Sequence, residues 1–286
     1  MNNSNKTNPG TTDWSLDVRS KIALVTGAAG GLGHSFTQCL LSAGATVIVS
    51  GRRREALESL TSDFPEHAGR IYVVTMDVTD EASVAEAFDT MADDVGIPDV
   101  VVSNAGIATS KKAMDLTGTD WDQVVDTNLK GCWLVANEAA RRLSAINRGG
   151  SIIMISSILG HRVAGNVAPY AAAKAGVEQL TRALALEWAR YGIRVNALAP
   201  GYIETDLNRD FFATEPGQKM IRRIPQRRLG QAGDLSGPLL LLASNLSDYM
   251  TGSTLTIGTI AGAGARSYLA VRGGVQVPEY LGSKST

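Results

Sequence analysis

The chain has 286 residues, of which 44% are hydrophobic, so it is long enough to bury a sizeable core as one large domain or two small ones. Its 27 basic and 28 acidic residues leave a formal net charge of -1, which gives no electrostatic reason to expect a nucleic acid or an anionic membrane as a partner. Two cysteines and three histidines without metal-ligand spacing argue against a disulfide framework and against a zinc site.

The N-terminal stretch MNNSNKTNPGTTD contains no apolar core of the kind that a signal peptide requires, and it predicts a flexible arm over residues 1–13. No apolar run in the chain approaches the roughly 20 residues of a membrane-spanning helix. We therefore expect a cytoplasmic protein with no membrane partner and no nucleic-acid partner.

From residue 21 onward, short apolar runs alternate with helical patterns. The predicted strands are KIALVTG (21–27), TVIVSG (46–51), RIYVVTMDV (70–78), DVVVSNAG (99–106), SIIMISS (151–157), IRVNALAPG (193–201) and STLTIG (253–258). These runs are rich in Val and Ile and lack polar alternation, which is typical of strands buried on both faces of a parallel sheet. The pattern predicts an α/β fold, a doubly wound sheet of seven parallel strands with helices on both faces and right-handed crossovers.

A glycine-rich stretch, VTGAAGGLG, ends the first predicted strand and opens the first predicted helix. Gly27, Gly31 and Gly33 permit a tight turn in which backbone N–H groups approach a pyrophosphate at the positive end of the helix dipole. Glycines also punctuate ordinary loops, so the stretch alone is weak evidence. Its position at the end of the first strand of a βαβ unit makes it a specific prediction of dinucleotide binding.

The end of the second predicted strand indicates which dinucleotide is bound. An acidic residue there would accept hydrogen bonds from a ribose 2′-OH and select NAD, but Gly51 is followed by Arg52 and no acid. A guanidinium can pair bidentately with a 2′-phosphate. We therefore predict NADP(H), with NAD(H) as the less favoured cofactor. The alternative is that Arg52 and the adjacent Arg53 belong to a solvated turn.

Tyr170 and Lys174 lie four positions apart in a helical pattern, which puts both side chains on one helix face. The simpler interpretation is a lysine stem packed over an aromatic ring. The chemical interpretation is an acid and the cation that tunes it. A free tyrosine has a pKa of about 10 and is a poor base near neutrality, whereas a neighbouring cation favours the phenolate.

Seven motifs in order decide between these interpretations. They are TGAAGGLG, MDV at Asp77, SNAG (103–106), DTNLKG around Asn128, ISS (155–157), YAAAK (170–174) and APGYIET (199–205). With them the chain resembles the short-chain dehydrogenase/reductases over residues 16–255, in the subgroup that includes 3-oxoacyl-carrier-protein reductases and gluconate or sugar dehydrogenases. No single motif is decisive, but their combination and order are specific.

The resemblance implies one Rossmann-fold catalytic domain over residues 14–258. It implies that Tyr170 is the general acid or base, and that Lys174 holds the nicotinamide ribose and lowers the pKa of that tyrosine. Ser157 would polarise the substrate carbonyl, and Asn128 would help to hold a water in a proton relay. Cofactor contacts are implied for Gly27, Gly31, Leu32, Gly33, Arg52, Asp77, Val78, Asn104, Ala105, Gly106, Tyr170, Lys174, Pro200, Gly201, Ile203 and Thr205.

The implied activity is hydride transfer between NADP(H) and a carbonyl or secondary alcohol, without a metal. An alternative is a non-catalytic NADP-binding protein on the same fold, since a fold does not determine a function. The residues after the Pro-Gly, about 202–228, would shape the substrate pocket, with Phe211 and Phe212 as apolar walls. The resemblance also implies a homotetramer, with a dimer as the alternative, assembled through the helices predicted over 121–146 and 170–190.

The C-terminal tail, residues 259–286, departs from the family pattern. The family usually continues its last strand into Asp-Gly-Gly, but here Gly-Thr-Ile, with no carboxylate, comes directly after Ile257. The segment SYLAVRGGVQVPEYLGSKST instead resembles a fragment of biotin-dependent carboxyltransferase or allophanate-hydrolase-like proteins. About twenty residues are too few for a domain, so no second activity is inferred from it.

Overall fold

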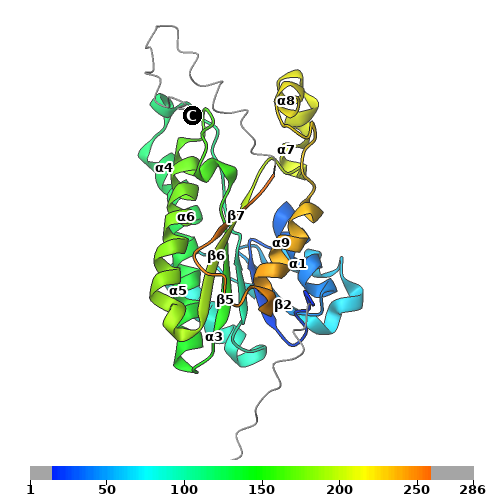
Figure 1. Cartoon of the computed structure of the whole chain (residues 1–286), viewed down its shortest axis with the longest axis vertical. Helices are drawn as coiled ribbons and strands as arrows, with labels where there is room; N and C mark the ends of the chain where they lie inside the picture. Colours follow the sequence, from blue (N-terminus) through cyan, green and yellow to red (C-terminus); the bar gives the residue numbers. More distant parts are fainter. Residues whose placement is uncertain (1–14, 259–286) are drawn as a thin grey trace, which may run out of the picture.

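The computed structural model describes residues 15–258, apart from the side chains of residues 206 and 207 (Figure 1). In this part of the chain seven parallel strands form one sheet in the order β3-β2-β1-β4-β5-β6-β7. The strands are β1 (Ile22–Thr26), β2 (Thr46–Gly51), β3 (Ile71–Thr75), β4 (Val100–Ser103), β5 (Gly150–Ile155), β6 (Ile193–Pro200) and β7 (Thr254–Ile257). All seven coincide with predicted runs, so the predicted sheet is confirmed. The predicted arm (1–13) and tail (259–286) lie outside the described residues.

Helices cover both faces of the sheet, as expected. They are α1 (Gly31–Ser42), α2 (Arg54–Thr61), α3 (Glu81–Asp94), α4 (Gly118–Val125), α5 (Gly131–Ala145), α6 (Ala168–Trp188), α7 (Asp206–Ala213), α8 (Glu215–Ile221) and α9 (Ser236–Ala243). Short 3-10 turns cover Pro65–Arg70, Ala113–Asp115, Ile158–Gly160, Ala189–Tyr191, Ala232–Leu235 and Asn245–Ser247. In Figure 1, α5 and α6 lie on one side of the sheet and α1 and α9 on the other.

Alternate residues of each strand supply the two hydrophobic layers. Leu24 of β1 and Ile48 of β2 are paired in register and belong to the layer that packs against α3, α5 and α6. Their neighbours Val25 and Val49, also paired, belong to the layer that packs against α1, α2 and α9. Because both faces are covered, the strands read as continuous apolar runs rather than as alternating ones.

The helix predicted over 121–146 is instead divided in two. A π turn, Asp126–Lys130, separates α4 from α5 and contains Asn128, which is buried. The side-chain amide of Asn128 accepts from Ile107 N at 2.7 Å and donates to Ile107 O at 2.7 Å. These two hydrogen bonds tie the π turn to the loop after β4. Single π turns inside helices occur frequently at functional sites.

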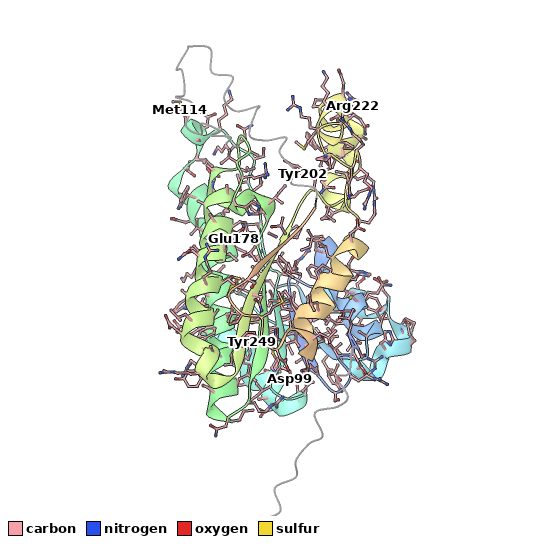
Figure 2. All side chains as sticks on the ribbon, viewed as in Figure 1. Asp99, Met114, Glu178, Tyr202, Arg222 and Tyr249 are labelled. Carbon is pink, nitrogen blue, oxygen red and sulfur yellow. The ribbon has the colours of Figure 1, made fainter. Side chains whose placement is uncertain are left out.

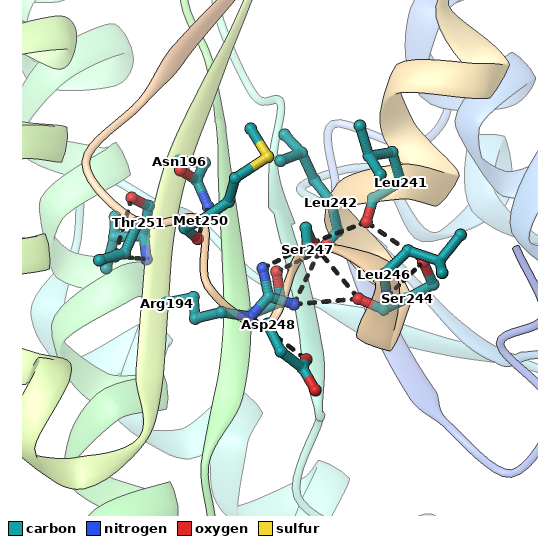
Figure 3. Close-up of polar contacts among 12 residues, drawn as sticks. Arg194, Asn196, Leu241, Leu242, Ser244, Leu246, Ser247, Asp248, Met250 and Thr251 are labelled. Carbon is teal, nitrogen blue, oxygen red and sulfur yellow. Dashed lines mark hydrogen bonds and ion pairs between the residues drawn. The ribbon is translucent and has the colours of Figure 1, made fainter. Parts of the chain in front are cut away.

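A polar network fixes the segment between α9 and β7 (Figure 3). Arg194 of β6 donates from Nη2 to Leu242 O at 3.0 Å and to Ser244 O at 3.2 Å, and from Nη1 to Ser247 Oγ at 2.8 Å. These bonds satisfy carbonyls at the C-terminal end of α9 that have no partner within the helix. The network therefore docks the last strand, whose Ile257 O in turn accepts a hydrogen bond from Gly201 N.

Candidate active site

The glycine turn between β1 and α1 leaves no room for side chains at two positions. Gly27 has φ +63°, and a Cβ atom added there would lie 2.8 Å from Ala105 Cα. A Cβ atom added at Gly33 would lie 2.3 Å from Gly27 O. Because α1 begins at Gly31, its unpaired N–H groups and positive dipole end lie at this turn. The turn is therefore a fitting cradle for a pyrophosphate.

A cavity of about 900 Å³ opens over the turn, where the strand order reverses between β1 and β4. The residues predicted to contact the cofactor all line it: Gly27, Gly31, Leu32, Gly33, Arg52, Asp77, Val78, Asn104, Ala105, Gly106, Tyr170, Lys174, Pro200, Gly201, Ile203 and Thr205. Ser157 lines it as well, whereas Asn128 does not. Segments far apart in the sequence thus form one space large enough for a dinucleotide and a small substrate.

Asn104 joins the two strands at the point where the order reverses. Its backbone N–H donates to Thr26 Oγ1 at 3.0 Å, and its side-chain amide donates to Thr26 O at 3.0 Å and to Gly27 O at 3.2 Å. These bonds fix the end of β4 against the glycine turn.

The far end of the cavity is lined by Arg52 and Asp77. Burial raises the pKa of Asp77, but bonds from Thr79 N–H and Thr79 Oγ1 and the charge of Arg52 outweigh that effect and hold the pKa below its ordinary value. Asp77 is therefore a charged acceptor. The exposed Arg52 directly follows Gly51, the last residue of β2, and no carboxylate stands at the end of this strand. A site for a 2′-phosphate requires such an arrangement.

Tyr170 and Lys174 occupy the other end, together with Ser157 at the end of β5. The Ser157 hydroxyl lies close enough to the Tyr170 hydroxyl to lower the pKa of the phenol. Lys174 is buried; its Nζ donates to Ile155 O at 2.7 Å and lies 5.5 Å from the centre of the Tyr170 ring. The lysine is thus not a solvated side chain packed over the ring, and Ser157 and Tyr170 both line the cavity.

Burial governs the ionisation of both groups on α6. It raises the pKa of Tyr170 above its ordinary value, and the hydrogen bond with Ser157 acts in the opposite direction. It lowers the pKa of Lys174 from 10.5 to about 8, while Cys132 acts in the opposite direction. The expected lowering of the Tyr170 pKa by Lys174 is not seen in the chain by itself, because desolvation dominates and the ammonium is directed at Ile155 O.

Known proteins match the chain over most of its length. The family model described as Enoyl-(Acyl carrier protein) reductase matches residues 27–259. Gluconate 5-dehydrogenase from Gluconobacter oxydans is 33% identical over 82% of this chain and 92% of its own. The 3-oxoacyl-acyl-carrier-protein reductase from Rickettsia bellii is 37% identical over 85% of this chain and 97% of its own. The chain belongs to the short-chain dehydrogenase/reductase family. Its predicted family and enzyme class, oxidoreductase, are confirmed.

Solved structures of this family agree with the fold. The crystal structure of a gluconate 5-dehydrogenase from Burkholderia cenocepacia in complex with NADP and tartrate superimposes with a TM-score of 0.81. It is 34% identical and covers 85% of this short-chain dehydrogenase/reductase and 96% of its own chain.

A second family model, described as Carboxyltransferase domain, subdomain A and B, matches residues 243–286. It overlaps the first match at residues 243–259 and agrees with the resemblance noted for the tail. Within residues 15–258 no helix is long and apolar enough to cross a membrane, and no cluster of His, Cys, Asp and Glu could hold a metal ion.

Tyr202 and Asn208 are among the residues that the sequence did not single out and that line the cavity of this short-chain dehydrogenase/reductase. Tyr202 packs edge-on against Phe212, with ring centres 6.3 Å apart. Phe211 and Phe212, expected as apolar walls, do not themselves line the cavity. Asn208 forms a capping box with Thr205 at the start of α7. The spacing T-x-x-N was the signal that could have revealed this helix start.

Proposed function

We propose that the chain transfers a hydride between NADP(H) and a carbonyl or secondary alcohol, with Ser157, Tyr170 and Lys174 as its reactive groups. The observation that carries the proposal is that Ser157, Tyr170 and Lys174 line the same cavity as the glycine turn. When bound, NADPH supplies the hydride. The NADP in the Burkholderia relative and the position of Arg52 support this cofactor.

In reduction, Tyr170 donates its proton to the oxygen of the substrate carbonyl as negative charge develops on it. Its raised pKa keeps the phenol protonated at neutral pH, which suits a proton donor. Ser157 supplies a second donor to the same oxygen. In oxidation the roles reverse, and the Lys174 ammonium then helps to stabilise the phenolate.

We assign Asn128 an indirect part in the proposed reaction, because it is buried in the π turn and does not line the cavity. Both atoms of its side-chain amide are bound to the backbone of Ile107. Asn128 therefore supports the proposed proton relay by fixing the π turn beside the loop after β4.

The test is turnover of a substrate panel in both directions with NADPH and with NADH. The panel contains gluconate and its 5-keto form, suggested by the gluconate dehydrogenase relatives, and a 3-oxoacyl thioester, suggested by the reductase relative. Turnover of one of these ketones with NADPH is the expected result. The alternative, a non-catalytic NADP-binding protein, predicts cofactor binding with no turnover of any member. Assembly as a homotetramer and residence in the cytoplasm remain predictions.

A further inference from the structure

One buried carboxylate on α6 is used by no step of the proposed reaction. Glu178 follows Lys174 by four residues, so Tyr170, Lys174 and Glu178 share one helix face. The side chain of Glu178 is only 10% exposed. Figure 2 labels it on α6, part-way along the helix. Burying a carboxylate is costly unless polar groups satisfy it, so its partners indicate why it is there.

Both hydrogen-bond partners of Glu178 belong to the loop that follows β5. Ser156 Oγ donates to Glu178 Oε1 at 3.1 Å, and the same hydroxyl lies 3.1 Å from Lys174 O. Nδ1 of His161 lies 3.1 Å from the same carboxylate oxygen. The carboxylate thus joins the two ends of a six-residue loop to the helix that carries Tyr170 and Lys174.

The middle of this loop is pressed against the same oxygen. A Cβ atom added at Gly160 would lie 2.5 Å from Glu178 Oε1 and 3.0 Å from Lys174 O. Ser157 lies between these anchors, and its Oγ accepts from Leu159 N at 3.2 Å. The path of the loop from Ser156 to His161 therefore decides where the Ser157 hydroxyl is held.

We propose that Glu178 is a positioning residue that holds Ser157 in place to donate to the substrate carbonyl. If the position served packing alone, an apolar side chain of similar size would fill it without the desolvation cost of a carboxylate. The inference rests on the proposed function, because it requires Ser157 to act on the substrate oxygen. Glu178 touches neither substrate nor cofactor and acts through the loop.

The test compares Glu178→Leu with Glu178→Gln, which keeps the size and an acceptor oxygen. The exposed Glu187 of the same helix supplies the control, Glu187→Leu. We expect Glu178→Leu to lower kcat by about 10- to 100-fold, since small displacements of reacting groups cost rates of this order. The Kd for NADPH, measured by fluorescence, stays within about twofold of wild type, because no cofactor group is touched. Glu178→Gln and Glu187→Leu keep kcat within about threefold of wild type.

A double-mutant cycle with Ser157→Ala separates positioning from general damage. If Glu178 acts through Ser157, Glu178→Leu costs little further kcat once the serine hydroxyl is gone. Additive losses, unchanged kcat in Glu178→Leu, or a parallel loss of NADPH affinity would each overturn the proposal. If Glu178→Leu does not fold, the same cycle is run with His161→Phe at the half-exposed loop position, with the same outcomes decisive.

The failure of this proposal is distinguishable from the failure of the proposed function. If Ser157→Ala and Tyr170→Phe are slow while Glu178→Leu is not, only the positioning role is overturned. If Ser157→Ala keeps wild-type kcat, the proposed function loses Ser157 and the positioning role falls with it.

Discussion

At the scale of single residues, we expect turnover to depend on the hydroxyl of Tyr170. The substitution Tyr170→Phe keeps the ring and its packing but removes the transferable proton, so we expect a loss of roughly 10²- to 10⁴-fold in kcat, the usual range for general acid–base catalysis. Cofactor affinity and folding should stay close to wild type. Steady-state kinetics and NADPH titration check this, and reduction by the variant at the wild-type rate would reject Tyr170 as the acid.

Arg52 is expected to carry most of the preference for NADPH over NADH. A hydrogen bond to a charged group contributes about 1.5–3 kcal/mol, which corresponds to on the order of ten- to a hundredfold in affinity. Arg52→Ala should therefore weaken NADPH binding and leave NADH binding almost unchanged. The adjacent exposed Arg53 also lines the cavity and can supply part of the contact, so the low end of the range is expected.

The substitution Gly51→Asp should shift the cofactor preference from NADPH toward NADH more strongly than Arg52→Ala does. A carboxylate at the end of β2 repels the 2′-phosphate of NADPH and accepts a hydrogen bond from a ribose hydroxyl of NADH. Kd values for both cofactors are measured at constant salt, since the contact is screened by ions. Equal weakening of both cofactors by Arg52→Ala would show that the arginine belongs to a solvated turn.

Burial of the Lys174 ammonium should lower the free energy of unfolding of the wild type at neutral pH. Its pKa is lowered to about 8 from 10.5, so between these pH values the unfolded chain binds a proton that the folded chain does not. Stability of the wild type therefore rises with pH through this window, and the full penalty is present below pH 8.

We expect Lys174→Met to abolish turnover and to raise the free energy of unfolding at pH 7 by about 1–3 kcal/mol, given about 1.4 kcal/mol per unit of pKa shift and the loss of the bond to Ile155 O. The gain should shrink as pH rises from 8 toward 10.5. Urea unfolding at several pH values checks both statements, and a variant less stable than wild type at pH 7 would contradict them.

At the scale of elements, the close approach of α1 to the glycine turn is the feature most sensitive to one methyl group. At Gly33 an added Cβ would lie 2.3 Å from Gly27 O and 2.7 Å from Ala28 Cα, both backbone atoms that cannot move aside cheaply. Gly33→Ala should therefore destabilise the fold by about 1–3 kcal/mol, as overpacking does, and should weaken NADPH binding.

Gly30→Ala is the matched control, because its added Cβ has no contact closer than 3.4 Å. Thermal unfolding without cofactor should separate the two variants by several degrees. Equal melting temperatures would show that α1 can shift to admit the methyl group.

At the scale of the whole molecule, we predict a homotetramer with a dimer as the alternative. The α5 surface carries Trp133, which is 39% exposed, and α4 carries Trp121 at 42%. Trp188, in the second helix expected to form an interface, packs partly against the core. Light scattering at micromolar concentration should give a tetramer. A dimer would support the alternative, and a monomer would contradict the prediction.

The sequence by itself determined the sheet, the phosphate cradle and the pairing of Tyr170 with Lys174. These features depend on local pattern: an apolar run such as KIALVTG becomes β1 because both its faces are buried. Glycines at Gly27 and Gly33 are required because the chain passes too close for a side chain. Four residues of helix place Tyr170 and Lys174 on one face whatever surrounds them.

Only the tertiary structure decided how these groups are held and charged. Asn128 binds Ile107 across 21 positions, and Glu178 binds Ser156 across 22 positions, so no local pattern announces either contact. The pKa of Tyr170 is raised although a lysine lies one turn away, because desolvation depends on everything packed around the phenol. Burial and long-range contacts are properties of the folded molecule, and they decide which of the predicted groups is neutral, charged or fixed in place.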